Sequence, residues 1–192
     1  MWRFEETKDG WQGKVKSKGL ETQRRDFAPR TSNLLKEVLR LILMEGKIEE
    51  AAILSHQTIM KTKQHGKITD LEEISDLILT RKYTKDDYKN PPVHVKLIQR
   101  MKERGDELPA IGDRVPFIII NEYGDKFAES AENPEYAIHH GYTINNSYYV
   151  ESQLMGPLER IFSCFDISGE MLMKGQYKSE KKKTAQSSLF SF

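Results

Sequence analysis

The sequence of 192 residues predicts an α+β fold, mostly helical with a small β-sheet. Three observations lead to this class. Apolar residues recur at helical spacing in several separate stretches. Val115–Ile120 is a short and almost continuous apolar run, which is typical of a buried strand. Near the N-terminus, the segments on either side of Lys8-Asp9-Gly10 can pair as a hairpin from Trp2 to Ser17, because Asp-Gly is a favoured two-residue turn.

The helices of the first half have recognisable start and stop residues. Arg30-Thr31-Ser32 offers a helix N-cap, and apolar residues then recur at helical spacing until Gly46, a residue type that commonly ends helices. A second helix is expected from about Ile48 to Lys63. A shorter helix over 70–77 and an extended segment over 79–83 complete this half.

The second half contains two more helices and ends in a polar stretch. Asn90-Pro91-Pro92 breaks the chain, and His94–Arg104 then has the pattern of an amphipathic helix. A long helix is expected over Tyr148–Phe165, with a kink at Pro157 because proline interrupts helical hydrogen bonding. Beyond about Ile167 the sequence is rich in polar residues and lysine, which is typical of a mobile tail.

Composition narrows the class of protein. Hydrophobic residues make up 38% and charged residues 31%, as in a polar globular protein. No run approaches the length of a membrane span, and no signal-peptide pattern begins the chain. The single cysteine, Cys164, excludes an internal disulfide and a cysteine-based zinc site. We therefore expect a cytoplasmic protein without a membrane partner and without a metal of its own.

Positive charge is unevenly distributed, although the net charge is only +1. Residues 1–30 hold eight Lys or Arg against five Asp or Glu, and residues 174–183 hold five lysines against one glutamate. A local basic face can bind an anionic partner even when the whole chain is nearly neutral. Nucleic acid therefore stays among the possible partners.

The residues do not indicate an active site within this chain. The five histidines lack metal-ligand spacing, and the sequence contains no phosphate-binding loop and no GxSxG motif. Cys164 lies beside Phe165 on an apolar helix, which favours a place in the core over a role as nucleophile. We expect no catalytic residue here.

One basic stripe is a candidate for phosphate contacts. Lys96, Arg100 and Arg104 recur every four residues and so share one face of their helix. Such a stripe could follow a phosphate backbone, although by itself the pattern is more typical of an ordinary solvated face. Residues 80–85 mix hydroxyls, cations and an aromatic ring, which suits phosphate contacts or any exposed strand end.

Longer motifs carry a family resemblance. They are GLETQRRD at residues 19–26, LTRKYTKDDYKNPPVHV at 79–95, MKERGDELPAIGDRVPFIII at 101–120, ESAENPEYAI at 129–138 and SYYVESQLMGPLERIF at 147–162. In this order the chain resembles the thumb of family B DNA polymerases, the archaeal and viral members most of all. GLETQRRD is similar to the element in which the palm of these enzymes passes into the thumb. The resemblance extends from about Lys16 to Phe165.

This resemblance implies a domain division and a set of DNA contacts. Residues 1–26 would be the end of the palm, 27–166 the thumb, and 167–192 a flexible basic tail. The thumb of this family wraps the primer–template duplex behind the active site. The residues that would contact DNA are Arg24 and Arg25 near the primer strand, then Lys82, Thr84, Lys89 and His94, together with Lys96 and Arg100 of the basic stripe.

The end of the chain is similar to a sliding-clamp-binding peptide. Gln186, Leu189 and Phe192 match the Q-x-x-h-x-x-aromatic pattern with which such polymerases often finish. In a 3₁₀ turn, residues three apart project together, so Leu189 and Phe192 would form one hydrophobic plug. Gln186 would supply an amide to a neighbouring polar pocket.

The sequence lacks the aspartate motifs that hold the two metal ions, the fingers helix and the exonuclease domain of the family. We therefore expect no polymerisation by this chain alone, no cofactor in it, and Mg²⁺ in a catalytic partner. The chain resembles the small subunit of a polymerase encoded in two parts, whose large subunit would carry exonuclease, palm and fingers. The alternatives are a truncated piece of a longer polymerase and a non-catalytic, clamp-binding DNA adaptor.

Overall fold

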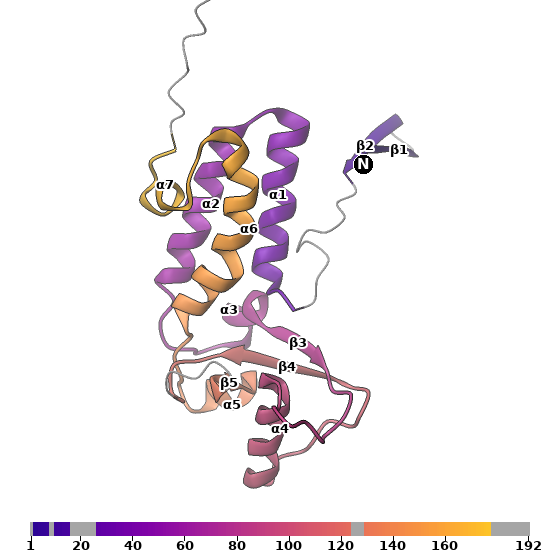
Figure 1. The fold of residues 1–192 in the computed structure, drawn as a ribbon, viewed down its shortest axis with the longest axis vertical. Helices are drawn as coiled ribbons and strands as arrows, with labels where there is room; N and C mark the ends of the chain where they lie inside the picture. The colour runs from indigo at the N-terminus through magenta and orange to yellow at the C-terminus, as the bar shows by residue number, and fades with distance from the viewer. Residues whose placement is uncertain (1, 8–9, 16–25, 124–128, 178–192) are drawn as a thin grey trace, which may run out of the picture.

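The structure is a computed structural model, and it describes residues 2–7, 10–15, 26–123 and 129–177. Helices α1, α2 and α6 run side by side, with α7 at their flank, and a small sheet with α4 and α5 lies at one end of this bundle (Figure 1). The class is therefore α+β, as the sequence predicts. No helix in these ranges is both long enough and apolar enough to cross a membrane.

The N-terminal hairpin forms between β1 (Trp2–Thr7) and β2 (Gly10–Val15), which pair antiparallel. Its register differs by one residue from the expected Asp-Gly turn. Thr7 lies opposite Gly10, so the glycine is the first residue of β2 and the connection consists of residues 8–9.

Helix α1 (Pro29–Glu45) begins earlier than the sequence predicts. Pro29 occupies the first turn, where its missing N–H costs no hydrogen bond, and Ala28 is the N-cap residue. Arg30 and Thr31 consequently lie inside the helix and are buried. The predicted stop is confirmed, because Gly46 ends α1 in the left-handed conformation with φ 67°.

Helix α2 (Ile48–Lys63) has the predicted bounds. Glu49 and Glu50 in its first turn and Lys61 and Lys63 in its last turn complement the helix dipole. It packs on α1 through small and β-branched side chains, among them Ala52 and Ile59.

The expected long helix with a kink at Pro157 is present as three joined segments. A π-helix, η4 (Tyr148–Met155), passes directly into α6 (Gly156–Phe162), and a 3₁₀ turn, η5 (Ser163–Phe165), follows. The change of helix type falls beside Pro157, because proline donates no hydrogen bond and its ring clashes with the carbonyl four residues earlier. Cys164 is exposed, so its predicted place in the core is wrong.

The fold continues further than the predicted start of the tail. Ile167 is buried, and Ser168 caps helix α7 (Gly169–Lys174) by accepting the N–H of Met171 at 3.2 Å. Helix α7 packs on α2 and buries Leu172 completely. Residues 167–177 are therefore part of the folded body, whereas residues 178–192 lie outside the described ranges.

The second layer is built on a three-stranded antiparallel sheet in the order β3-β4-β5. Its strands are β3 (Leu79–Lys82), β4 (Arg114–Ile119) and β5 (Ala131–Glu132). The short helix α3 (Leu71–Ile74) and the 3₁₀ turn η2 (Ser75–Leu77) precede the sheet, as predicted for this region. The amphipathic helix expected between the strands is α4 (Val93–Arg104), and α5 (Pro134–His139) follows β5.

The two layers have separate hydrophobic cores. Leu97, Phe117 and Ile119 belong to the core around the sheet, whereas Leu35 and Phe162 belong to the core of the helical bundle. Helix η4 joins them, since its neighbouring residues 149 and 150 are buried in different cores.

Polar contacts reinforce this junction. Gln153 accepts the backbone N–H of Ala28 at 2.9 Å, in a buried position. Arg30 is bound by both oxygens of Asp76, at 2.8 and 2.9 Å. Such a two-fold contact holds a guanidinium in one orientation, so it fixes the start of α1 against η2.

Candidate nucleic-acid interface

Five of the eleven predicted binding residues lie outside the described ranges: Arg24, Arg25, Gln186, Leu189 and Phe192. Asp26, the last residue of the GLETQRRD motif, lies within the described ranges. Asp26 lies 3.4 Å from the guanidinium of Arg81, which is exposed on β3. This ion pair brings the end of the motif to the strand from which the next predicted contacts start.

The exit of β3, the loop after it and the start of β4 form an exposed cationic edge, which we define as Arg81, Lys82, Lys85, Lys89 and Arg114. Lys82 lies directly opposite Arg114 in the β3–β4 register. Like charges in this position destabilise a sheet, and both side chains are exposed. Lys82 and Lys89 have no ionic partner within the described residues. An anion placed on this edge would relieve the repulsion.

The loop after β3 is ordered by aromatic residues. The buried Tyr83 hydroxyl donates to Asp86, and this bond raises the pKa of Tyr83 to about 12. The Tyr88 hydroxyl lies 2.8 Å from that of Thr84, and the Lys85 ammonium lies 4.8 Å from the centre of the Tyr88 ring. Thr84 is exposed, although its hydroxyl already has one partner, and its contact with DNA stays a prediction.

His94 does not lie on this edge, contrary to the prediction. It is only 6% exposed, and both ring nitrogens are buried without a hydrogen-bond partner in the structure. Burial lowers the pKa of His94, and the charge of Arg81 lowers it further. The reason is its helix position, since residue 94 shares the inward face of α4 with Leu97, Ile98 and Met101. A neutral imidazole behind the edge cannot neutralise a phosphate.

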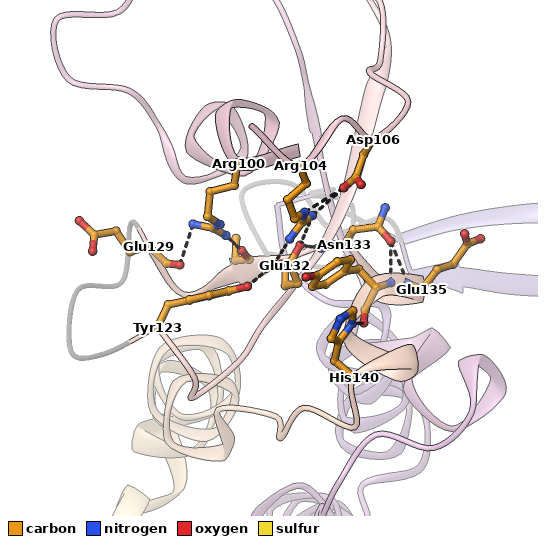
Figure 2. Close-up of polar contacts among 11 residues, drawn as sticks. Arg100, Arg104, Asp106, Tyr123, Glu129, Glu132, Asn133, Glu135 and His140 are labelled. Atoms are coloured by element: carbon orange, nitrogen blue, oxygen red, sulfur yellow. Dashed lines mark hydrogen bonds and ion pairs between the residues drawn. The ribbon is translucent and has the colours of Figure 1, made fainter. Parts of the chain in front are cut away.

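The basic stripe of α4 is neither a solvated face nor a free row of cations (Figure 2). Lys96 lies 3.4 Å from the carboxylate of Glu129. Arg100 donates to the carbonyl oxygens of Glu129, at 3.0 Å, and Ala131. Arg104 is paired with Glu132. The stripe therefore holds α4 against β5, and DNA contacts by Lys96 and Arg100 stay a prediction that would have to compete with these bonds.

Glu132 is the buried centre of this network, with a fully buried side chain. Its carboxylate accepts two bonds from Arg104, at 2.9 and 3.1 Å, and one each from the Tyr123 hydroxyl and the Asn133 N–H. Burial disfavours the charged form of Arg104, but hydrogen bonds to Glu132 and Asp106 outweigh this effect and raise its pKa. A buried carboxylate with all these donors is satisfied, which makes the network structural.

Within the part of the chain that the structure describes, no group of three or more His, Cys, Asp or Glu side chains could hold a metal ion. That Mg²⁺ belongs to a catalytic partner stays a prediction.

Sequence reasoning missed Arg114. Its place in the cationic edge depends on the pairing of β3 with β4, which are separated by a helix and a loop. The available signal was its position at the start of the predicted strand, on the same side as Pro116 in an alternating pattern.

Comparison with known protein families assigns the chain that carries this surface to a family. Residues 3–165 match the family model described as DNA polymerase family B. The chain belongs to DNA polymerase family B. The match covers the hairpin, the sheet with its cationic edge, and the bundle through η5.

The relatives of this family B chain include the "DNA polymerase delta catalytic subunit" of several eukaryotes. That of Candida albicans is 39% identical over 150 residues, which are 78% of this chain and 14% of that protein. That of Schizosaccharomyces pombe is 37% identical over 84% of this chain and 14% of that protein, and that of Drosophila melanogaster is 34% identical over 85% and 15%. The chain thus spans about one seventh of these relatives. Its archaeal or viral type stays a prediction.

Proposed function

We propose that this family B chain is the thumb portion of a DNA-directed DNA polymerase, and that it grips primer–template duplex through its cationic edge. The observation that supports the proposal most directly is the opposed pair Lys82 and Arg114, on the strands that flank a loop carrying Lys89, for which the described residues offer no ionic partner. Unpaired cations on an ordered body are what a phosphate backbone requires. The relatives are catalytic subunits of a DNA polymerase by name, which favours nucleic acid over other anions.

Such a grip reads no sequence, because cations contact phosphates that are the same in every duplex. If about three to five phosphates are neutralised, the logarithm of the binding constant should fall with the logarithm of salt concentration with a slope of roughly −3 to −5. The isolated chain should bind weakly. In the assembled enzyme it would instead slow dissociation, because the palm holds the thumb at high effective concentration.

Arg24 and Arg25 are proposed to extend the edge toward the primer strand. They immediately precede Asp26 in the sequence, and Asp26 is paired with Arg81 of the edge. Their loss should weaken primer–template retention by the same factor for every DNA sequence, since backbone contacts carry no sequence information.

The C-terminal residues are proposed to tether the enzyme to a sliding clamp. Residues 178–185 are rich in lysine and lead to Gln186, Leu189 and Phe192. Tyr177, which precedes this segment, packs on the flank of the bundle. A tether that leaves the folded body there would start on the bundle, whereas the cationic edge belongs to the sheet layer (Figure 1).

Catalysis is proposed to reside in a large subunit that carries the exonuclease, palm and fingers together with Mg²⁺. The two-part enzyme is our preferred arrangement, and the hairpin β1–β2 would pair with the palm strands of that subunit. If this proposal holds, the chain acts at sites of DNA replication.

The test of the grip removes charge from the edge and from a matched surface. In the first variant Lys82, Lys89 and Arg114 become alanine. In the control, three exposed lysines of the bundle, Lys36, Lys61 and Lys63, become alanine, so that the net charge of the two variants is equal.

Duplex binding is measured by fluorescence anisotropy over a range of salt concentrations. We expect the edge variant to lose about 2 to 3 from the salt slope, since each phosphate contact contributes about 0.9, and the control to keep the slope of the parent. Equal losses in the two variants would mean that DNA responds only to net charge, and the edge would not be the binding surface.

A further inference from the structure

An exposed apolar surface surrounds the loop that joins α4 to β4. Leu108 is 42% exposed and Ile111 is 65% exposed, with Pro109 between them. Single exposed leucines are normal on protein surfaces. Leu108 and Pro109 line two neighbouring hollows, and Ile111 lines one of them.

The hollows have volumes of about 520 and 400 Å³. The larger has a mixed lining from α4, β4, α5 and the loops beside them, in which Met101, Val115 and Tyr136 lie beside several carboxylates. The smaller reaches back to Tyr83 and Ile98. The two hollows share Leu108 and Pro109, and we call them together the α4–β4 groove.

The rim of this groove is acidic. Asp106, Glu107, Asp113 and Glu135 line the larger hollow, and Asp86 lines the smaller one. Lys102 is the one cation among the lining residues of these two hollows. Arg104 lies behind the wall, where it neutralises Asp106 and covers the ring of Tyr136 at 3.6 Å. Figure 2 shows Asp106, Asn133 and Glu135 gathered on this side of Arg104.

The groove is ordered without a partner. Asp113 accepts the N–H of Ala110 at 2.9 Å and so closes the loop on itself. The backbone of Tyr83 holds the loop on both sides, because its N–H donates to Asp113 and its carbonyl accepts from Gly112, at 2.8 and 2.7 Å. A surface that is already ordered loses little conformational entropy on binding.

We propose that the α4–β4 groove docks an extended segment of a partner protein that carries lysine or arginine on both sides of a leucine or phenylalanine anchor. The anchor fills the larger hollow beside Leu108. Long cationic side chains lay their methylene stems on Tyr136 and Pro116 and place their charges near Glu107 and Glu135.

Charge decides against other occupants. A second copy of this chain would meet the groove through a self-complementary contact and would bring the acidic rims together. Nucleic acid would be repelled by the same carboxylates. The inference therefore does not depend on the proposed DNA grip, which uses different residues on the neighbouring loop and strands.

The test uses the full chain and two labelled peptides. The probe is Lys-Arg-Leu-Phe-Lys-Arg, and its charge-reversed counterpart is Glu-Glu-Leu-Phe-Glu-Glu. One variant carries Leu108→Ser and Ile111→Ser, and a second carries Glu107→Gln and Glu135→Gln. The matched control carries Glu49→Gln and Glu103→Gln, which are exposed and line neither hollow. All the substituted side chains are exposed, so thermal unfolding should stay close to that of the parent.

We expect saturable binding of the basic peptide to the parent and no binding of the acidic one. Each groove variant should bind at least about tenfold more weakly, whereas the control should equal the parent. Equal binding to parent and groove variants, or binding of the acidic peptide, would overturn the proposal. So would a concentration-dependent dimer that Leu108→Ser with Ile111→Ser converts to monomer, because a second copy would then be the occupant.

Discussion

At the level of single residues, the cations of this chain have two distinct fates. Arg100 and Arg104 form hydrogen bonds with β5 and the residues beside it, because carbonyls and a buried carboxylate lie within reach of their helix face. Lys82 and Arg114 lie opposite each other in the β3–β4 register, and neither has an ionic partner among the residues that the structure describes. Residue type alone does not separate these cases. What differs is the group that the neighbouring strand places opposite each cation: a carbonyl or a carboxylate for Arg100 and Arg104, and another cation for Lys82.

His94 provides a pH test at this scale. Burial and the charge of Arg81 lower its pKa below the ordinary 6.5 in the folded protein. As pH falls through 6.5, the unfolded chain takes up the proton first, so the stability contributed above this pH is lost toward the folded-state pKa. We expect His94→Gln to flatten the pH dependence of the free energy of urea-induced unfolding in this window.

The control for this test is His139→Gln, because His139 is exposed at the end of α5. The pH dependence measured for this variant is the reference for the His94 variant. If the two variants behave alike, the buried imidazole is not the group that titrates.

At the level of elements, the ends of helices could be predicted from neighbouring residues in the sequence, whereas the existence and packing of α7 could not. Gly46 and Gly105 end α1 and α4 in the left-handed conformation that glycine adopts without strain. The segment around α7 is polar and short, yet Leu172 is covered by α2, and the His56 ring nitrogen Nδ1 lies 2.8 Å from the Leu172 carbonyl oxygen. This segment, which the sequence predicted as part of the tail, folds as a helix because it packs against α2.

Leu172→Ala tests whether α7 belongs to the folded body. The side chain is fully buried, so its truncation should cost about 2 to 5 kcal/mol in the free energy of unfolding. Leu43→Ala, at a position 46% exposed on α1, should change it by no more than about 0.5 kcal/mol. Chemical denaturation measures both. Equal and small effects would show that α7 behaves as part of the tail.

At the level of the whole molecule, two cores joined by η4 carry separate surfaces. The sheet layer holds the cationic edge and the α4–β4 groove, while the bundle ends near the point where residues 178–192 begin. DNA binding and clamp binding should therefore be separable by mutation.

Replacing Leu189 and Phe192 with alanine tests this separation. Binding to the sliding clamp should weaken by at least about tenfold, because both apolar prongs of the motif are lost. Duplex binding without the clamp should equal that of the parent. Ser188→Ala with Ser191→Ala is the matched control, since these positions alternate with the prongs. A joint loss of clamp and duplex binding would indicate that the end of the chain supports the fold instead.

The sequence alone was sufficient for the helices with strong apolar periodicity, for the buried strand and for the family. Residues 48–63 and 94–104 have the helical pattern within themselves, and motifs such as LTRKYTKDDYKNPPVHV are contiguous. Periodicity and motifs are local properties, so they can be read without knowing the fold.

Only the tertiary structure decided which polar residues are free. Arg104 meets Glu132 across 28 residues, and Lys82 meets Arg114 across the whole of α4. His94 is buried because the face of its helix packs on the sheet core. Pairing and burial depend on contacts between segments distant in the chain, and such contacts determine whether a cation is available to DNA.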